Sequence, residues 1–458
     1  MKELRAEDKI ITQVKRVHMI GIGGSGMCPL AEILHSKGYE LTGSDNNESD
    51  PLKRIKNLGI KVYMGHNAEN IKGAELIVYS AAISHDNPEL VAARENGIPT
   101  MERSHLLGAI TRKFENVIGV CGTHGKTTVT SMITQILLLN KCDLTAVIGG
   151  RLPMINSNGI AGNSETMVCE ACEFVDTFLQ MSPDISVLLN IDNDHLDYFK
   201  TMENLILSFH KFIKMSKKAY INGDDKLVLK AAKGIDAEKV TFGLGDSNDY
   251  YAENITAGKF GFCFDVMKGK EKLINLELHV PGRHNVLNAL ASFAVCYEQN
   301  VEPIGIKEAL EKFTGAGRRF EFLGEYNGFT LADDYAHHPT EIKATLNAAK
   351  QLSYRRVIAV FQPFTFSRTA LLKDDFVKAL SVADKVILTP IMGSREVNTY
   401  GISSEAIAEK LADAVVVDGF DNIADKIIET AEENDIVITM GGGDIYKAAH
   451  IVQEKLSR

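Results

Sequence analysis

Short apolar runs rich in Val and Ile alternate with amphipathic helical patterns along almost the whole chain. This alternation is typical of parallel sheets covered by helices, whose strands are buried on both faces. The nucleotide-fold pattern of strand, loop and helix begins three times, at residues 18–26, 116–128 and 356–360. Further strands are expected near Val386 and Ile436. The sequence therefore predicts an α/β protein with three domains.

Three domains also fit the length of 458 residues, since a single domain commonly holds about 100–150 residues. Domain boundaries are expected near residues 111–115 and near residues 313–317. The second is a glycine-bearing stretch between a helical pattern and a new strand. The predicted domains are residues 1–112, 113–313 and 314–458.

Composition excludes several classes of function. With 45% hydrophobic and 24% charged residues, the chain resembles soluble globular enzymes. A net charge of -10 argues against broad affinity for nucleic acid or anionic membranes, so small-molecule partners are expected. The seven cysteines are scattered singly apart from Cys169-x-x-Cys172, so they indicate reduced thiols, with Cys169 and Cys172 as small packing residues rather than a zinc or redox site. The sequence shows neither a signal peptide nor an apolar run of about 18 residues, so a cytoplasmic location is expected.

The run GTHGKTT at residues 122–128 is the most informative local motif, because it follows an apolar strand pattern and opens a helical one. In this setting glycines let backbone N–H groups approach a polyphosphate, Lys126 reaches the β- and γ-phosphates, and the Thr127 hydroxyl ligates Mg²⁺. A plain strand-to-helix turn is the alternative, and the flanking strand and helix disfavour it. ATP and Mg²⁺ are therefore the expected cofactors.

An acid and an imidazole follow two further strands of the same region. A short apolar strand delivers Glu170, and the strand at residues 185–189 precedes His195. Beside the phosphates these groups would suit Mg²⁺, a hard cation that takes carboxylate oxygen and accepts neutral imidazole. Taken singly, Glu170 fits a solvated strand end and His195 a helix cap, so the metal site depends on their combination with the loop.

A second glycine-rich turn, GIGGSG at residues 21–26, follows an apolar strand, and Asp45 ends the next strand about 20 residues further on. Such a turn places a pyrophosphate at a helix N-terminus, and a nucleotide sugar carries a pyrophosphate as NAD does. An NAD-dependent oxidoreductase and a purely structural turn are the alternatives. Neither accounts for GTHGKTT, Glu170 and His195.

With these motifs in order, the chain resembles the Mur ligase family over essentially its whole length, most closely the group that adds L-alanine to UDP-N-acetylmuramate. The matching segments are GIGGSGM (21–27), GTHGKTT (122–128), EACEFVDTFL (170–179), NIDNDHLD (190–197), PGRHNVLNA (281–289), GAGRRFE (315–321), DDYAHHPTE (333–341) and FQPFTFSRT (361–369). The resemblance implies a Rossmann-like N-terminal domain for the UDP-sugar, a central P-loop ATPase domain and a Rossmann-like C-terminal domain for the amino acid.

The resemblance also implies a reaction of cytoplasmic peptidoglycan synthesis, and with it roles in cell shape and division. The lactyl carboxylate of UDP-N-acetylmuramate attacks the γ-phosphate of ATP, and L-alanine captures the acyl phosphate. Phosphorylation is needed because a carboxylate at pH 7 is a poor acylating agent. UDP-N-acetylmuramate and L-alanine are the expected partners of a monomer or weak homodimer, without nucleic acid or membrane.

Site residues follow from the same resemblance. The ATP site is assigned to Gly122, Thr123, His124, Gly125, Lys126, Thr127, Thr128, His284, Asn285, Arg319 and Asp334. The UDP-sugar site is assigned to Gly21, Gly23, Gly24, Ser25, Gly26, Asp45, His66 and Ser80. The Mg²⁺ ligands are Thr127, Glu170 and His195, and the catalytic set is Lys126, Glu170, His195, His337 and Arg368.

For the amino acid, Arg368 would pair with the carboxylate and His337 would lie near the amine. A surface salt bridge at Arg368 and a helix start at His338 are the alternatives. The chain has Phe364 where many alanine-adding members carry a histidine, which weakens the prediction of strict alanine selectivity. A ligase that attaches a preformed peptide for recycling, and more distantly a non-catalytic ATP and nucleotide-sugar sensor, stay open.

Overall fold

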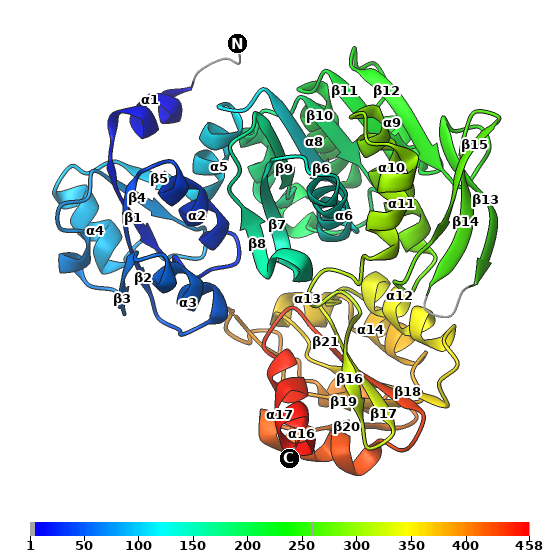
Figure 1. Cartoon of the computed structure of the whole chain (residues 1–458). Helices are drawn as coiled ribbons and strands as arrows, with labels where there is room; N and C mark the ends of the chain where they lie inside the picture. Colours follow the sequence, from blue (N-terminus) through cyan, green and yellow to red (C-terminus); the bar gives the residue numbers. More distant parts are fainter. Residues whose placement is uncertain (1–4, 258–260, 395, 458) are drawn as a thin grey trace. The chain divides into compact units, whose positions relative to one another are not determined.

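The computed structural model describes residues 5–257, 261–394 and 396–457. In these ranges the strands form three sheets, most of whose strand pairs are parallel (Figure 1). The chain divides into two compact units, of which the first holds residues up to 254 with 264–276 and 287–312. The second holds residues 255–263, 277–286 and those from 313 onward. The predicted α/β class is confirmed by this alternation of strands and helices.

The first sheet has the order β3-β2-β1-β4-β5 and is parallel throughout. Its strands are β1 (Arg16–Ile20), β2 (Glu40–Asp45), β3 (Lys61–Met64), β4 (Leu76–Tyr79) and β5 (Thr100–Glu102). The helices around it are α1 (Ala6–Gln13), α2 (Cys28–Ser36), α3 (Asp50–Asn57), α4 (Pro88–Glu95) and α5 (Arg103–Thr111), with the 3-10 turn η1 (Ala68–Ile71). The strand order reverses at β1, between the connections that follow β1 and β4, and open parallel sheets commonly bind ligands at such a switch point.

The second sheet has ten strands in the order β15-β14-β13-β12-β11-β10-β6-β9-β7-β8. The strands are β6 (Asn116–Cys121), β7 (Thr145–Leu152), β8 (Ser157–Ile160), β9 (Thr166–Glu170), β10 (Ile185–Leu188), β11 (Lys218–Asn222), β12 (Glu238–Gly243), β13 (Tyr250–Ala257), β14 (Phe262–Lys268) and β15 (Glu271–Glu277). The helices are α6 (Lys126–Leu139), α7 (Leu196–Phe199), α8 (Met202–Lys214), α9 (Lys226–Ala231), α10 (His284–Glu298) and α11 (Pro303–Glu311), with η2 (Pro153–Ile155) and η3 (Phe174–Gln180).

The third sheet lies in the second unit and has the order β16-β17-β21-β18-β19-β20. Only the edge pair β16–β17 is an antiparallel hairpin among its paired strands in the described residues. The strands are β16 (Glu321–Tyr326), β17 (Phe329–Asp334), β18 (Arg356–Phe361), β19 (Lys385–Leu388), β20 (Ala414–Val416) and β21 (Asp435–Met440). The helices are α12 (Pro339–Lys350), α13 (Phe366–Leu371), α14 (Lys373–Leu380), α15 (Glu405–Ala408), α16 (Phe420–Thr430) and α17 (Tyr446–Leu456).

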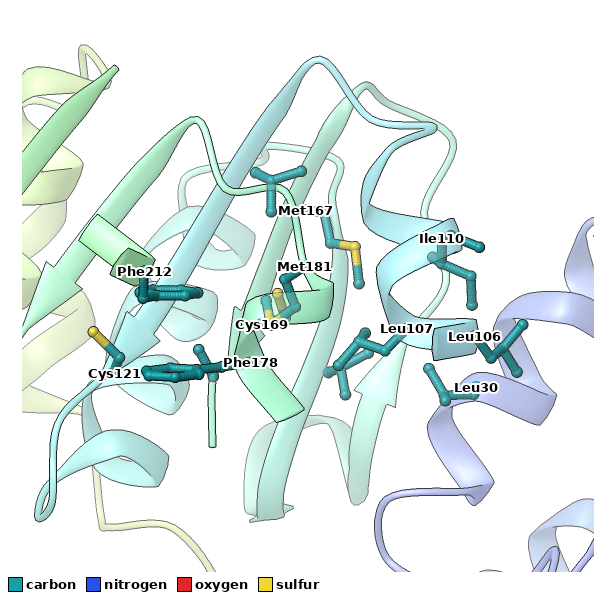
Figure 2. Packing of buried hydrophobic residues seen from close by; sticks show 14 of the residues in the cluster. Leu30, Leu106, Leu107, Ile110, Cys121, Met167, Cys169, Phe178, Met181 and Phe212 are labelled. Carbon is teal, nitrogen blue, oxygen red and sulfur yellow. The ribbon is translucent and has the colours of Figure 1, made fainter. Parts of the chain in front are cut away.

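A large apolar core supports the first unit. Phe178 stacks on Phe212 with ring centroids 4.7 Å apart, and Cys121 and Cys169 fill space beside them (Figure 2). Leu107 of α5 belongs to the same cluster, which therefore joins α5 to the second sheet. This packing favours the interpretation of Cys169 as a small core residue. None of the helices in the described ranges combines the length and apolarity needed to cross a membrane.

Candidate active site

Three neighbouring parallel strands of the second sheet carry the middle-domain site. They are β10, β6 and β9, adjacent in that order, and the predicted loop, Glu170 and the segment before His195 follow their carboxyl ends. The carboxyl ends of parallel strands lie at one edge of a sheet, where α/β proteins bind ligands. The topology thus gathers these three segments at a single edge.

Backbone N–H groups of the loop between β6 and α6 donate hydrogen bonds to Asn190, which follows β10. Thr123 N donates to Asn190 O at 3.1 Å, and His124 N donates to Asn190 Oδ1 at 2.8 Å. Gly125 has a left-handed φ of 87°, and a Cβ there would lie 2.7 Å from Asn288 Oδ1. Glycine is therefore required at this turn both by backbone conformation and by space.

Lys126, the first residue of α6, is turned back onto its own loop. Its Nζ donates to Gly122 O at 2.6 Å and Thr123 O at 2.9 Å, and it lies 2.9 Å from Glu173 Oε2. Burial lowers the pKa of Lys126, but the negative groups around it, Glu173 foremost and Glu170 among them, together outweigh burial and raise the pKa above its ordinary value. Lys126 is thus a fixed positive charge. The sequence analysis assigned no role to Glu173, although it is the second acid of the EACEFVDTFL segment.

Thr127 and Glu170 meet directly. Thr127 Oγ1 donates to Glu170 Oε2 at 2.9 Å, and Gly149 N donates to the same oxygen at 2.8 Å. A Cβ at Gly149 would collide with the carboxylate. A hydroxyl and a carboxylate that are placed together in this way are hard oxygen donors of the type that Mg²⁺ prefers, so these two residues fit the predicted metal.

His195 is arranged differently from these two residues. It has a left-handed φ of 57°, its Nε2 lies 3.5 Å from Asp194 Oδ2, and its ring lies 4.9 Å from that of Phe174. Among the described residues no group of three or more His, Cys, Asp and Glu side chains is placed to hold a metal ion. The assignment of His195 as a metal ligand therefore stays a prediction.

The predicted UDP-sugar residues converge at the carboxyl ends of β1 and β2. Gly21 N donates to Ser44 O at 2.8 Å, and Gly23 N donates to Asp45 Oδ2 at 3.0 Å. The segment after β3 reaches the same place, since His66 Nδ1 lies 3.1 Å from Ser44 Oγ. Gly24 and Ser25 are exposed at this turn. Ser80 follows the neighbouring strand β4, where its hydroxyl accepts from Ala82 N at 3.3 Å.

In the second unit, two consecutive arginines have different surroundings. Arg318 donates to Asp333 Oδ2 at 2.8 Å and to Gly441 O at 2.7 Å, so it holds the loop after β21. The guanidinium of Arg319 lies over the Tyr335 ring at 5.1 Å. Arg318 thus acts inside the fold, whereas Arg319 is the one of the pair whose charge suits an anionic ligand.

Both carboxylate oxygens of Asp334 accept hydrogen bonds from backbone N–H groups. Its Oδ2 accepts from Phe320 N and its Oδ1 from Ala336 N, both at 2.7 Å. Burial raises the pKa of Asp334 to about 6, although Arg319 and these two donors oppose the rise. The predicted ribose contact of Asp334 stays a prediction, and in this structure the carboxyl group shapes the loop that carries Arg319.

His337 follows β17 in the same loop. Its Nδ1 lies 3.0 Å from Tyr335 O, and because a carbonyl only accepts, Nδ1 carries the hydrogen and Nε2 keeps its lone pair. Burial lowers the pKa of His337, the Glu341 carboxylate opposes this, and the Arg368 charge lowers the pKa further. His337 is therefore a neutral base at pH 7, within electrostatic reach of the other predicted amino-acid residue.

Beside His337 lie Phe364, which the sequence analysis named, and the glycines after β21, which it did not. The Phe364 ring lies 6.5 Å from that of His337. A Cβ at Gly442 would lie 3.4 Å from His337, and a Cβ at Gly443 would collide with Gln362 Oε1 and Met392 Sδ. Gln362 Oε1 is buried without a hydrogen-bond partner in the described part of the chain. The GGG run after the last strand is the sequence signal that could have indicated these close contacts.

His284 and Asn285 begin α10. His284 is exposed, and Asn285 Nδ2 donates to Pro281 O at 2.7 Å. Gly282 has a left-handed φ of 95° and turns the chain into the helix. Both residues belong to the second unit and Lys126 to the first, so their shared role at ATP stays a prediction.

Comparisons with known proteins agree with this architecture. Three family models match in order, those of the Mur ligase family catalytic domain at residues 16–115, the Mur ligase middle domain at 120–296 and the Mur ligase glutamate ligase domain at 318–443. A UDP-N-acetylmuramate–L-alanine ligase from Acetivibrio thermocellus is 46% identical over 95% of each chain. One from Caldicellulosiruptor saccharolyticus is 44% identical over 96% of this chain and 99% of the relative.

Solved structures give the same result. UDP-N-acetylmuramate-alanine ligase from Thermotoga maritima matches with a TM-score of 0.84 and 29% identity, over 96% of this chain and 99% of that one. A murein peptide ligase from Psychrobacter arcticus matches with a TM-score of 0.76 and 25% identity, over 97% and 99%. The predicted three-domain architecture and the predicted resemblance are confirmed, and the chain belongs to the Mur ligase family.

Proposed function

We propose that the chain is an ATP-dependent ligase that joins L-alanine to the lactyl carboxylate of UDP-N-acetylmuramate in cytoplasmic peptidoglycan synthesis. The observation that carries this proposal is the identity of 46% over 95% of the chain to a relative named for that reaction. The geometry supports it, because the chain offers candidate residues for a triphosphate loop, for a nucleotide-sugar turn and for contacts to an amino acid. The proposal assigns these roles to residues 113–313, 1–112 and 314–458, respectively, in a monomer or weak homodimer.

The first half-reaction needs charge neutralisation and positioning rather than covalent help from the protein. Lys126 supplies a permanent positive charge at the triphosphate loop, since Glu173 keeps it protonated. For ATP to bind there, its γ-phosphate replaces Glu173 or the loop carbonyls as a partner of Nζ. Thr127 and Glu170 would hold Mg²⁺, which when bound supplies further positive charge against the phosphates.

The second half-reaction needs a neutral amine close to the acyl carbon. His337 Nε2 has a lone pair, because Nδ1 donates to Tyr335 O. Its lowered pKa keeps it unprotonated at pH 7, so it accepts a proton from the incoming ammonium group. Arg368 is assigned to the carboxylate of the amino acid, which an arginine recognises through two parallel hydrogen bonds.

A ligase that attaches a preformed peptide is the second candidate, favoured by the match to the murein peptide ligase at a TM-score of 0.76. The contacts that separate the two lie around His337. Phe364 lies beside His337 and Met392 lies beside Gly443, so these side chains are where we expect a small and a large acceptor to be distinguished.

The deciding experiment measures phosphate release from ATP, Mg²⁺ and UDP-N-acetylmuramate with L-alanine, glycine, L-serine or a tripeptide as acceptor, with product mass confirmed. We expect the fastest turnover with L-alanine. Preference for the tripeptide would assign the enzyme to recycling. Absence of sugar-dependent release with every acceptor would favour the nucleotide-sugar sensor.

A further inference from the structure

A buried carboxylate lies beneath the nucleotide-sugar turn of the first sheet, and no role has been assigned to it. Glu89 of α4 has a fully buried side chain. Its Oε2 accepts from Ser44 Oγ at 2.7 Å, and its Oε1 accepts from Asn70 Nδ2 at 2.6 Å. His66 Nδ1 lies 3.1 Å from Oε2, and His18 Nε2 lies 3.6 Å from Oε1. These donors come from separate segments and converge on one side chain.

The carboxylate is ionised at neutral pH. Burial raises the pKa of Glu89, but His18, Ser44 and Asn70 outweigh burial and lower it to about 2. Burying a charge costs free energy that an apolar side chain of similar size would avoid, and a buried ion pair often contributes no net stability. A buried charge at a ligand-binding edge is therefore expected to have a role besides packing.

His66 connects this charge to the surface. A carboxylate only accepts, so the Nδ1 of His66 carries the hydrogen that it donates to Glu89. The imidazole is 15% exposed, and its Nε2 has no hydrogen-bond partner within the described ranges. Glu89 thus fixes both the ring orientation and the protonated nitrogen, and it leaves Nε2 available to a ligand.

The same network touches the glycine-rich turn. Ser44 binds Glu89 through its hydroxyl and accepts from Gly21 N through its carbonyl. The next residue, Asp45, accepts from Gly23 N through its side chain and from Gly65 N through its carbonyl. The turn, the end of β2 and the segment before His66 are therefore held in one arrangement around the buried charge.

We propose that Glu89 is a positioning residue for the nucleotide sugar, which holds His66 through Nδ1 so that Nε2 contacts the diphosphate. This inference rests on the proposed function, because it takes UDP-N-acetylmuramate as the ligand of this edge. Among the three substrates, it assigns to Glu89 an effect on the binding of the nucleotide sugar and none on the binding of ATP or the amino acid.

The test compares Glu89→Gln, His66→Ala and the double variant in the full-length enzyme. We expect each single variant to raise the KM for UDP-N-acetylmuramate about tenfold, the equivalent of one charge-assisted hydrogen bond, with unchanged KM for ATP and L-alanine. The double variant should be no worse than His66→Ala, because Glu89 acts through that ring. Additive losses, or equal rises in all three KM values, would overturn the proposal.

Glu75→Gln is the matched control. Glu75 accepts from the backbone of Lys15 and Arg16, at the amino ends of the strands, and pairs with Arg16. Its substitution removes a carboxylate from the same domain at the end away from the glycine turn. We expect its KM values to equal those of the wild type, and a raised KM for the nucleotide sugar would count against a specific role of Glu89.

A measurement on the unmodified enzyme covers the case in which Glu89→Gln does not fold. ¹⁵N spectra of labelled histidines, with His66 assigned by loss of its signal in His66→Asn, report which ring nitrogen carries hydrogen. We expect Nδ1 to be protonated and Nε2 to shift on addition of UDP. A hydrogen on Nε2 alone would overturn the inference. Wild-type enzyme without sugar-dependent turnover would instead refute the proposed function, so the two failures are distinguishable.

Discussion

Lys126 is the side chain on which the first half-reaction depends most. We expect Lys126→Ala to reduce kcat by at least about 10²- to 10³-fold, because it removes a preorganised charge from the phosphate site. The side chain packs no apolar core, so the variant should keep the wild-type circular dichroism spectrum. Lys113→Ala is the matched control, since Lys113 is exposed and its Nζ donates to the Tyr39 hydroxyl at 3.3 Å. Near-normal turnover by folded Lys126→Ala would refute the phosphate-loop assignment.

The lowered pKa of His337 leads to a prediction about the pH dependence of kcat/KM. Burial and the Arg368 charge lower the pKa of His337 from its ordinary 6.5, so the neutral base persists into mildly acidic solution and is lost only below that value. We therefore expect the acidic limb of kcat/KM for the amino acid to lie below pH 6.5. The limb should be absent in His337→Gln, whose residual rate lacks a proton acceptor at this position. A limb that is unchanged in the variant would show that another group titrates.

Sequence reasoning could assign roles only to side chains that belong to a local motif. Lys126 and Thr127 stand at fixed positions in a short motif, and the structure places Thr127 on Glu170. Sequence reasoning missed Glu173 and Gln362, because the surroundings of these two residues depend on segments far away in the sequence. Lys126 is 47 residues from its partner Glu173, and Gln362 meets Gly443 only after the last strand has paired.

At the level of the elements, the buried Glu89 at the edge of the first sheet leads to a prediction about the stability of β1 and β2. The pKa of Glu89 is lowered from 4.5 to about 2, so its contribution is fully present above pH 4.5 and is lost as the pH falls toward 2. The shift corresponds to at most about 3 kcal/mol. We expect hydrogen exchange from β1 and β2 peptides to be slower in wild type than in Glu89→Gln at pH 6, with the difference shrinking at pH 3. A difference independent of pH would assign the effect to packing.

The strands were predictable where hydrophobic runs are bounded by glycine, as at β1 and β6. The ten-stranded width of the second sheet was not, because strands from β11 onward carry no motif and their order depends on long-range pairing. Nor did the sequence indicate the left-handed backbone of Val175 and Asp176, at φ 54° and 56°. Asp176 accepts from Tyr198 at 2.9 Å and also from Ser208, so tertiary bonds offset a conformation that a β-branched residue disfavours.

Across the whole chain, the two half-reactions are assigned to different units. Lys126 lies in the first unit and His337 in the second, so substitution of one leaves the other's local structure intact. The family resemblance assigned roles to both residues from the order of the motifs, whereas no local pattern in the sequence encodes how the units are arranged. The separation makes the half-reactions testable one at a time.

We expect His337→Ala to form acyl phosphate at close to the wild-type rate but to add L-alanine about 10²-fold more slowly, the usual contribution of a general base. Lys126→Ala should lose both steps, because no acyl phosphate forms for the amine to capture. Hydroxylamine trapping with ATP and UDP-N-acetylmuramate in the absence of L-alanine measures the first step, and product mass measures the second. Equal losses of both steps in His337→Ala would show that the ring supports the fold of its loop, since a base that acts only on the amine has no means of slowing phosphoryl transfer.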